Sequence, residues 1–162
     1  MTQLVVVDAD VLGRERTGDE TYVRNLLRLL PGVAAAAPLR FAAVTRHPEL
    51  VPEGVEPVEL ATASQKRRMA WTLPRLLRRL GAELVHTQYA VPVRCPCPAV
   101  VTVHDLSFAR DGSLMRPRDR AVFRRVVPRA VRTAARVASS TRPSTRGSGC
   151  RCSRRWRAAP RS

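Results

Sequence analysis

The stretch QLVVVDAD, residues 3–10, decides the fold, because it is a continuous apolar run that ends on two aspartates. Such a run is typical of a parallel strand buried on both faces of a sheet. A glycine-bearing loop, VLGRERTGDE (11–20), follows it, and DETYVRNLLRLL (19–30) then carries apolar residues at helical spacing. Pro31 and Gly32 predict the end of this helix. Strand, loop and helix in this order form the opening unit of a doubly wound α/β fold.

The same alternation of strands and helices continues to residue 137. Further strands are predicted at RFAAVT (40–45), PVEL (57–60), AELVHTQ (82–88) and AVVTVH (99–104), and further helices at 64–81 and 116–137. Pro74 is expected to open the second half of the first of these helices and Gly81 to end it, and Pro128 to kink or divide the other. The pattern predicts an α/β fold, a Rossmann-like parallel sheet with helices on both faces.

The pattern changes at Ala138. Residues 138–162 contain seven arginines, no acidic residue and no apolar period. A segment of this composition cannot bury enough apolar surface to order itself. We therefore predict one domain over residues 1–137, followed by a disordered Arg/Ser-rich basic tail over 138–162.

The composition limits the choice of partners. The 162 residues suffice for one domain, and the net charge of +16 favours an anionic partner. However, Lys66 is the only lysine among 29 basic residues, a bias that GC-rich codons produce, and no nucleic-acid-binding motif accompanies the charge. The chain begins without the basic region of a signal peptide, and no apolar run is long enough to span a bilayer. The sequence thus argues against nucleic acid and predicts a cytoplasmic chain, peripheral to the membrane if it contacts one.

The four cysteines form two C-x-C pairs, Cys95 with Cys97 and Cys150 with Cys152. Zinc sites usually have two to four residues between paired cysteines, and prolines stiffen the first pair. We therefore predict free thiols and no metal site.

Polar residues lie where the predicted strands end, which is where ligands bind in open α/β sheets. Gly18, at the start of the first helix, suits the approach of a phosphate to backbone N–H groups, although a plain connection explains it equally well. His86 fits a structural histidine as well as a ligand-binding one.

His104 and Asp105 follow the strand 99–104 directly. Neighbouring residues of an extended chain point to opposite sides, so a direct His–Asp hydrogen bond is not expected. We expect His104 to face a cleft and Asp105 to bind backbone amides of the next turn. The alternative is that both residues only cap the strand.

Four segments resemble a known enzyme family in the same order along the chain. VVTVHDLSF (100–108) looks like the strand-end signature of family 4 glycosyltransferases, the retaining enzymes of the GT-B fold. TGDETYVRNLL (17–27) resembles the loop and first helix of that family, and AELVHTQYAVP (82–92) resembles its fourth strand. RAVFRRVVPRAVRTAARV (120–137) is similar to the helix before its next strand. The resemblance covers residues 3 to about 137.

The resemblance implies an N-terminal, acceptor-side domain whose C-terminal partner domain binds a nucleotide-diphosphate sugar. It implies no cofactor beyond this donor substrate, and it leaves the acceptor unknown. The implied site consists of His104 and Asp105 (catalytic), Gly18 and Asp19 (donor diphosphate loop), and Tyr22, His86 and Tyr89 (acceptor cleft). Asp19 and Glu20 depart from the smaller or glycine-containing pair of many relatives, and two carboxylates would repel a phosphate.

The end of the chain departs further from the family, because relatives continue into another strand and a donor domain. We therefore expect a truncated or frameshifted product that transfers no sugar alone. The alternative is a non-catalytic Rossmann-like binding module whose basic tail meets an anionic partner. A dehydrogenase is disfavoured, because the G-x-G-x-x-G fingerprint is missing.

Overall fold

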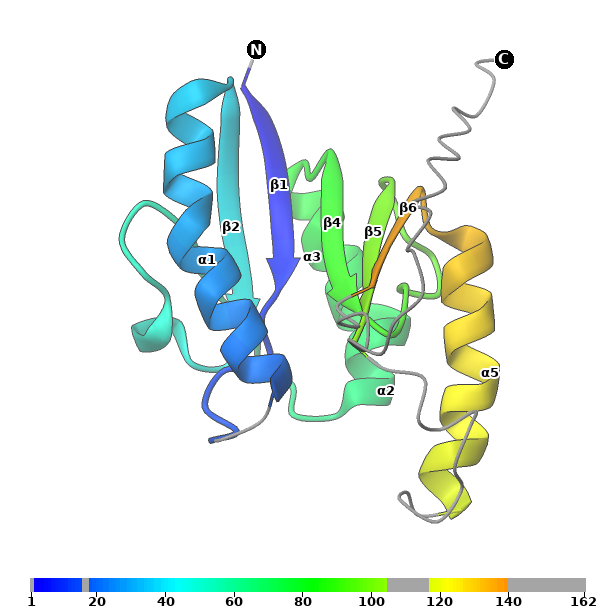
Figure 1. The fold of residues 1–162 in the computed structure, drawn as a ribbon. Coiled ribbons are helices and arrows are strands. Elements are labelled where there is room, and N and C mark those ends of the chain that lie inside the picture. The colour runs from blue at the N-terminus through cyan, green and yellow to red at the C-terminus, as the bar shows by residue number, and fades with distance from the viewer. Residues whose placement is uncertain (1, 16–17, 105–116, 140–162) are drawn as a thin grey trace, which may run out of the picture.

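Six parallel strands form the centre of the structure, a computed structural model that describes residues 2–15, 18–104 and 117–139 (Figure 1). The strands lie in the order β3-β2-β1-β4-β5-β6, and each neighbouring pair is parallel. Their bounds are β1 Gln3–Asp8, β2 Leu39–Thr45, β3 Glu56–Glu59, β4 Leu84–Gln88, β5 Ala99–Val103 and β6 Arg136–Ser139. This confirms the predicted α/β fold with a Rossmann-like parallel sheet.

The strand order creates a switch point between β1 and β4. The chain builds outward from β1 to β3, returns to the centre and then builds outward again through β4, β5 and β6. In sheets of this topology the connections leave opposite faces at the switch point, and ligands bind at the carboxyl ends of the strands there. His86 on β4 lies beside Val7 of β1 and Val100 of β5, so it sits next to this point.

Helices cover both faces of the sheet, with α1 on one side and α3 on the other (Figure 1). Helix α1, Gly18–Ala36, buries Val23 and Leu27 in one core with residues of β1 and β2. On the opposite face, α2 (Gln65–Arg67) leads into a π-helical turn (Arg68–Thr72) and α3 (Leu73–Leu80), and the turn and α3 pack on a second core. Helix α5, Pro117–Thr133, packs Val127 and Ala130 against β5.

Helix α1 is longer than predicted, because Pro31 and Gly32 do not end it. Proline removes one helical hydrogen bond, a cost that is offset here because Leu30 and Ala34, on either side, pack against the core. The ring of Pro31 also has room: Gly54 has φ +83°, and a Cβ atom there would lie 2.9 Å from Cγ of Pro31.

The predicted helix over 64–81 is divided into three pieces. Pro74 lies at the start of α3, as expected, and Gly81 ends it with φ +66° in the left-handed region. The unexpected piece is the π-helical turn at Arg68–Thr72, since such turns are rare and often occur at functional sites.

The last predicted helix was too long. It ends at Thr133, with Pro128 inside it, and β6 follows at Arg136–Ser139. The Ala135 N–H donates to the carbonyl of Ala99 at 2.8 Å, which begins the pairing of β6 with β5. The boundary predicted between residues 137 and 138 falls inside this strand. Residues 140–162 of the predicted tail lie outside the described residues.

Within the described ranges, no helix is long and apolar enough to cross a bilayer.

Candidate functional site

His104 follows β5 directly, at the carboxyl edge of the sheet. Its side chain is 11% exposed. The ring of Tyr22, from α1, meets its ring edge-on with 4.7 Å between centroids, and the ring of Tyr89 lies 5.5 Å away. Two predicted site residues from distant parts of the sequence, Tyr22 and Tyr89, therefore lie against the imidazole of a third, His104.

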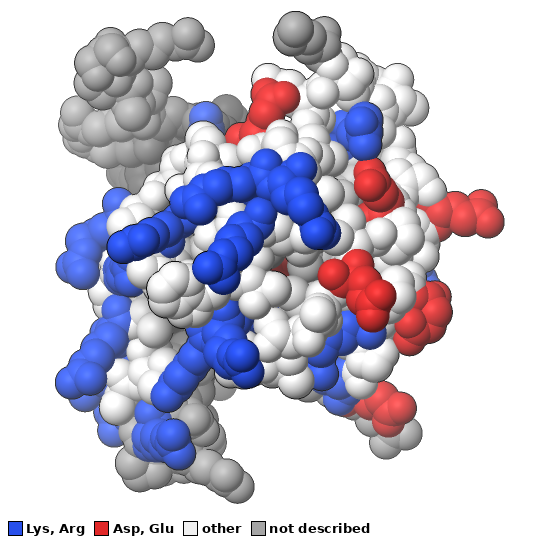
Figure 2. All heavy atoms as spheres, turned by 180° about the vertical axis from the view of Figure 1, so that it is seen from behind, with Lys and Arg blue, Asp and Glu red and all other residues white. Residues whose placement is uncertain are grey.

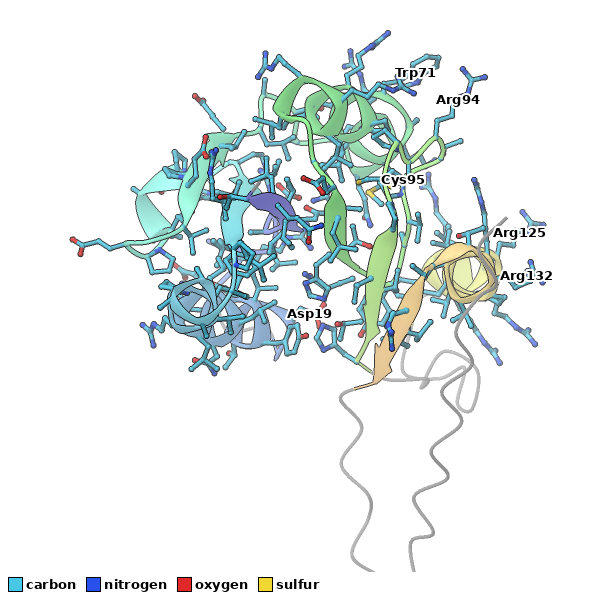
Figure 3. The ribbon with its side chains drawn as sticks, turned by 90° about the horizontal axis from the view of Figure 1, so that it is seen from above. Asp19, Trp71, Arg94, Cys95, Arg125 and Arg132 are labelled. Atoms are coloured by element: carbon cyan, nitrogen blue, oxygen red, sulfur yellow. The ribbon has the colours of Figure 1, made fainter. Side chains whose placement is uncertain are left out.

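Asp19 also reaches this histidine. Its Oδ1 lies 3.8 Å from Nε2 of His104, and Figure 3 shows Asp19 between α1, to which it belongs, and the sheet. Gly18 is the first residue of α1, and a Cβ atom there would meet no atom of the described residues within 4 Å. The described part of the chain thus leaves space at this helix N-terminus, next to an acidic side chain.

Glu20 does not add a second free carboxylate at this point. It is buried, and its Oε1 accepts hydrogen bonds from Nη2 of Arg24 at 2.7 Å and from the N–H of Gly13 at 3.2 Å. The hydrogen bond from Arg24 is the main reason that the pKa of Glu20 is lowered. The expected repulsion of a phosphate by two carboxylates is therefore reduced to that of Asp19.

His86 lies beneath His104 in a hydrogen-bonded group. Its Nε2 lies 2.8 Å from Oγ1 of Thr102, and the same hydroxyl lies 3.1 Å from Oη of Tyr22. Burial, with a smaller effect of His104, lowers the pKa of His86 from 6.5 to about 4, so its ring is neutral at physiological pH. Its Nδ1 is buried and has no hydrogen-bond partner among the described residues.

Thr102 was not predicted from the sequence, although it joins two predicted residues. A hydroxyl has one proton to donate and two lone pairs, so it can serve His86 and Tyr22 at once. The available signal was its place as the only polar residue in the run AVVTV, two residues before His104. Side chains two apart on a strand share a face.

Tyr89 holds an unusual backbone conformation just after β4. Its φ is +58°, in the left-handed region that residues other than glycine rarely adopt. Its ring contacts His104 on one side and Phe123 of α5 on the other, with 5.1 Å between the latter centroids. The strained position therefore sets the ring between the histidine and α5.

A second polar cluster lies at the end of β1. Nη1 of Arg68, from the π-helical turn, is 2.7 Å from Oδ1 of Asp8 and 3.1 Å from Oδ2 of Asp10. Asp10 also pairs with Arg46 at 2.6 Å and with Arg14 at 3.1 Å. Burial raises the pKa of Asp8, and Arg68 opposes this effect. The cluster joins β1 to the π-helical turn on the opposite face from α1, and it was missed because Arg68 lies about 60 residues away along the chain.

Asp105, the remaining predicted catalytic residue, lies outside the described residues, as do Cys150 and Cys152. Cys95 and Cys97 are free and partly buried, and burial, with Cys95 close by, raises the pKa of the Cys97 thiol to about 12. In the described part of the chain no three potential metal ligands come together.

The described residues bring together two histidines, two tyrosine rings and the N-terminus of α1 at the carboxyl edge of the sheet. Comparison with known proteins found no matching family model, curated protein or solved structure.

Proposed function

We propose that the chain is the acceptor-side domain of a retaining glycosyltransferase of family 4, with the GT-B architecture. Such an enzyme transfers a sugar from a nucleotide-diphosphate donor to an acceptor. The observation that carries the proposal is the enclosure of His104 at the carboxyl edge of β5, between Tyr22 and Tyr89. The segments 17–27, 82–92 and 100–108, which resemble the family, are the ones that supply these residues.

The proposed reaction joins the acceptor hydroxyl to the anomeric carbon of the sugar. The bond from that carbon to the diphosphate breaks, the diphosphate keeps the electron pair, and the hydroxyl proton leaves with it. His104 hydrogen-bonds the donor sugar and so fixes its position, and the rings of Tyr22 and Tyr89 keep water from the oxocarbenium-like transition state. Backbone N–H groups at Gly18, aided by the helix dipole, face the diphosphate.

His86 acts in this proposal as a positioning residue. Because its ring is neutral and bonded to Thr102, it adds no charge to the site. Thr102 in turn holds the hydroxyl of Tyr22, whose ring packs on His104. The donor-side domain belongs to the proposal as sequence encoded downstream of the codon for Ser139, and we expect no transfer by residues 1–162 alone.

The nucleotide sequence beyond the codon for Ser139 tests this proposal first. We expect one reading frame to encode a second α/β domain, and the restored protein to release nucleoside diphosphate from UDP-glucose or GDP-mannose when an acceptor is present. His104→Ala should lower this rate about 100-fold. Arg132→Ala, on the exposed side of α5, is the matched control and should leave the rate unchanged. Absence of a second domain in every frame, or a rate insensitive to His104→Ala, would contradict the proposal.

A second candidate function is a binding module for an anionic partner. Figure 2, which views the α3 side, shows basic residues gathered over much of the face and acidic residues toward the β3 edge. Trp71, Arg75, Arg78 and Arg94 line one shallow hollow on α3 and the loop after β4. Trp71 is 58% exposed, and the Arg75 guanidinium lies 5.4 Å from its ring. Figure 3 shows Trp71 and Arg94 pointing outward.

Co-sedimentation with vesicles of phosphatidylglycerol and phosphatidylcholine tests this second candidate. We expect binding that falls with salt and is lost in Arg75→Glu/Arg78→Glu, while Arg28→Glu on α1 serves as the control. Deletion of residues 140–162 tests the tail separately. Equal binding to neutral vesicles would exclude this function.

A further inference from the structure

A groove runs between α5 and the segment that holds α2 and the π-helical turn. Its volume is about 520 Å³, within the range of sites that bind small molecules. Its apolar lining comes from three places: Met69, the chain after β4 with Val91 and Val93, and α5 with Val122 and Val126. Val93 is 50% and Val122 46% exposed, so apolar surface stays open to solvent along the groove.

The charges along this groove all have one sign. Lys66, Arg118, Arg125 and Arg129 are its charged lining residues, and none of the acidic residues in the described ranges lines it. None of the four forms an ion pair with a described residue. The cations are thus not neutralised by the described part of the protein itself.

Helix α5 presents the two kinds of residue on one stripe. Arg118, Val122, Arg125 and Arg129 recur at intervals of three and four residues, which places them on one helix face. Nη2 of Arg129 donates to the carbonyl of Val93 at 3.2 Å, which ties α5 to the chain after β4. Figure 3 shows Arg125 projecting from α5 on the side of Arg94. The groove is therefore a built feature with an apolar lining and cationic borders.

We propose that this groove binds an amphiphilic anion, a single alkyl chain with a phosphate headgroup. The chain lies on the valine and methionine side chains, and the headgroup meets the arginines of α5. A simple anion would need the charges but not the apolar lining, and an uncharged alkyl compound would leave the cations without counter-charge. The inference rests on the groove alone and does not require sugar transfer. Tyr89, which lines the groove, also contacts His104, so an occupant would adjoin the candidate site.

Calorimetric titration of the full chain with decyl phosphate tests the inference, with hexyl phosphate, inorganic phosphate and decyl maltoside as comparisons. We expect saturable binding of decyl phosphate with one molecule per chain. Affinity should rise about threefold for each methylene added between hexyl and decyl, as far as the groove accommodates the chain. Inorganic phosphate and decyl maltoside should bind at least about tenfold more weakly. Equal binding of inorganic phosphate would show a plain anion surface and overturn the inference.

Three substitutions on α5 test whether decyl phosphate binds in the groove. Arg125 lines the groove, so Arg125→Glu should weaken the binding of decyl phosphate about fivefold or more. Arg132 lies outside the groove, so Arg132→Glu makes the same charge change there and should have little effect on this binding. Val122 is half-exposed, so Val122→Asp should leave the chain folded. This variant should weaken the binding of decyl phosphate and remove the dependence of affinity on alkyl chain length. Equal loss in Arg125→Glu and Arg132→Glu, or unchanged affinity in Val122→Asp, would contradict the groove as the site. Circular dichroism of each variant confirms that it is folded.

Discussion

Two polar clusters lie at the carboxyl edge of the same sheet, and they satisfy buried polar atoms in different ways. At the end of β1, the buried side chains of Asp8 and Asp10 pair with arginines. Arg68 contacts both of them, and Arg46 and Arg14 also pair with Asp10. At the ends of β4 and β5, His86 and Thr102 form a hydrogen-bonded group in which the histidine is kept neutral.

This difference indicates which cluster can interact with a ligand. The carboxylates of the first cluster are each held by guanidinium groups, so the cluster acts as a structural tie between β1 and the π-helical turn. Each cluster has one buried nitrogen without a partner among the described residues, Nε of Arg68 in the first and Nδ1 of His86 in the second. Only in the second cluster does a neighbouring ring, that of His104, lie at the strand tip beside Asp19. We infer that the first cluster supports the fold and the second cluster forms the site.

The largest expected effect comes from breaking the first cluster with Arg68→Met. It removes the arginine that pairs with Asp8, while Asp10 keeps Arg46 and Arg14, and should lower the free energy of unfolding by about 3–5 kcal/mol in urea denaturation at pH 7. The pKa of Asp8 is already raised by burial, and removal of Arg68 raises it further. Stability that depends on a raised carboxyl pKa is present at low pH and lost as pH rises. The deficit of the variant should therefore shrink in acid, and a deficit constant with pH would contradict this account.

The next effect is the pH dependence that His86 gives to stability. Its pKa is about 4 in the folded chain and near 6.5 when unfolded, so the unfolded state binds more protons between these values. Stability should therefore fall as pH drops from 6.5 to 4, by about 3 kcal/mol from this residue. Urea denaturation across this range checks the slope, and His86→Gln, which cannot titrate, should flatten it. An equal slope in both proteins would show that His86 is not held neutral.

A smaller effect is expected from Thr102→Val, which keeps the shape of the side chain and removes the shared hydroxyl. Nε2 of His86 and the hydroxyl of Tyr22 lose a partner, so the free energy of unfolding should fall by about 1–3 kcal/mol. Thr102→Ser retains the hydroxyl and is the matched control. If serine and valine cost the same, the hydroxyl does not organise the site.

The smallest effect is expected at an exposed ion pair. Nη2 of Arg40 lies 2.9 Å from Oε2 of Glu56, and these side chains are 62% and 50% exposed. Arg40→Met should change the free energy of unfolding by less than about 1 kcal/mol, because water screens the pair. Comparison of this variant with Arg68→Met shows how much burial of an ion pair increases its effect on the free energy of unfolding. A loss similar to that of Arg68→Met would undermine the comparison.

The sheet could be predicted because its strands are local apolar runs. QLVVVDAD, RFAAVT and AVVTVH each indicate a buried strand without reference to the rest of the chain. The element boundaries were predicted wrongly where contacts between distant parts of the sequence determine the structure. Helix α1 continues past Pro31 because of core packing and of Gly54, and β6 forms because β5 offers its edge to a segment whose local pattern suits a helix.

The site was predicted in part for the same reason. Topology brings strand ends together, so His86 and His104 could be expected at one edge, and the resemblance added Tyr22, Tyr89 and Asp19. The hydroxyl of Thr102 and the guanidinium of Arg68 were missed, because their roles depend on contacts made only in the folded chain. The role proposed for Asp105 stays a prediction.

The central claim is that the histidine cluster receives the donor sugar. The most direct test is NMR of residues 1–162 labelled with ¹³C-histidine and joined to the unlabelled donor-side domain, because the three labelled histidines, His47, His86 and His104, give separate ring signals. Titration with UDP-glucose and GDP-mannose should shift the signals of His104 and His86 with one of the two donors. His47, which pairs with Glu49 at 3.1 Å, reports on non-specific change and should stay in place. The account would be contradicted if neither donor at saturation shifted the His104 signal, or if the His47 signal shifted by the same amount.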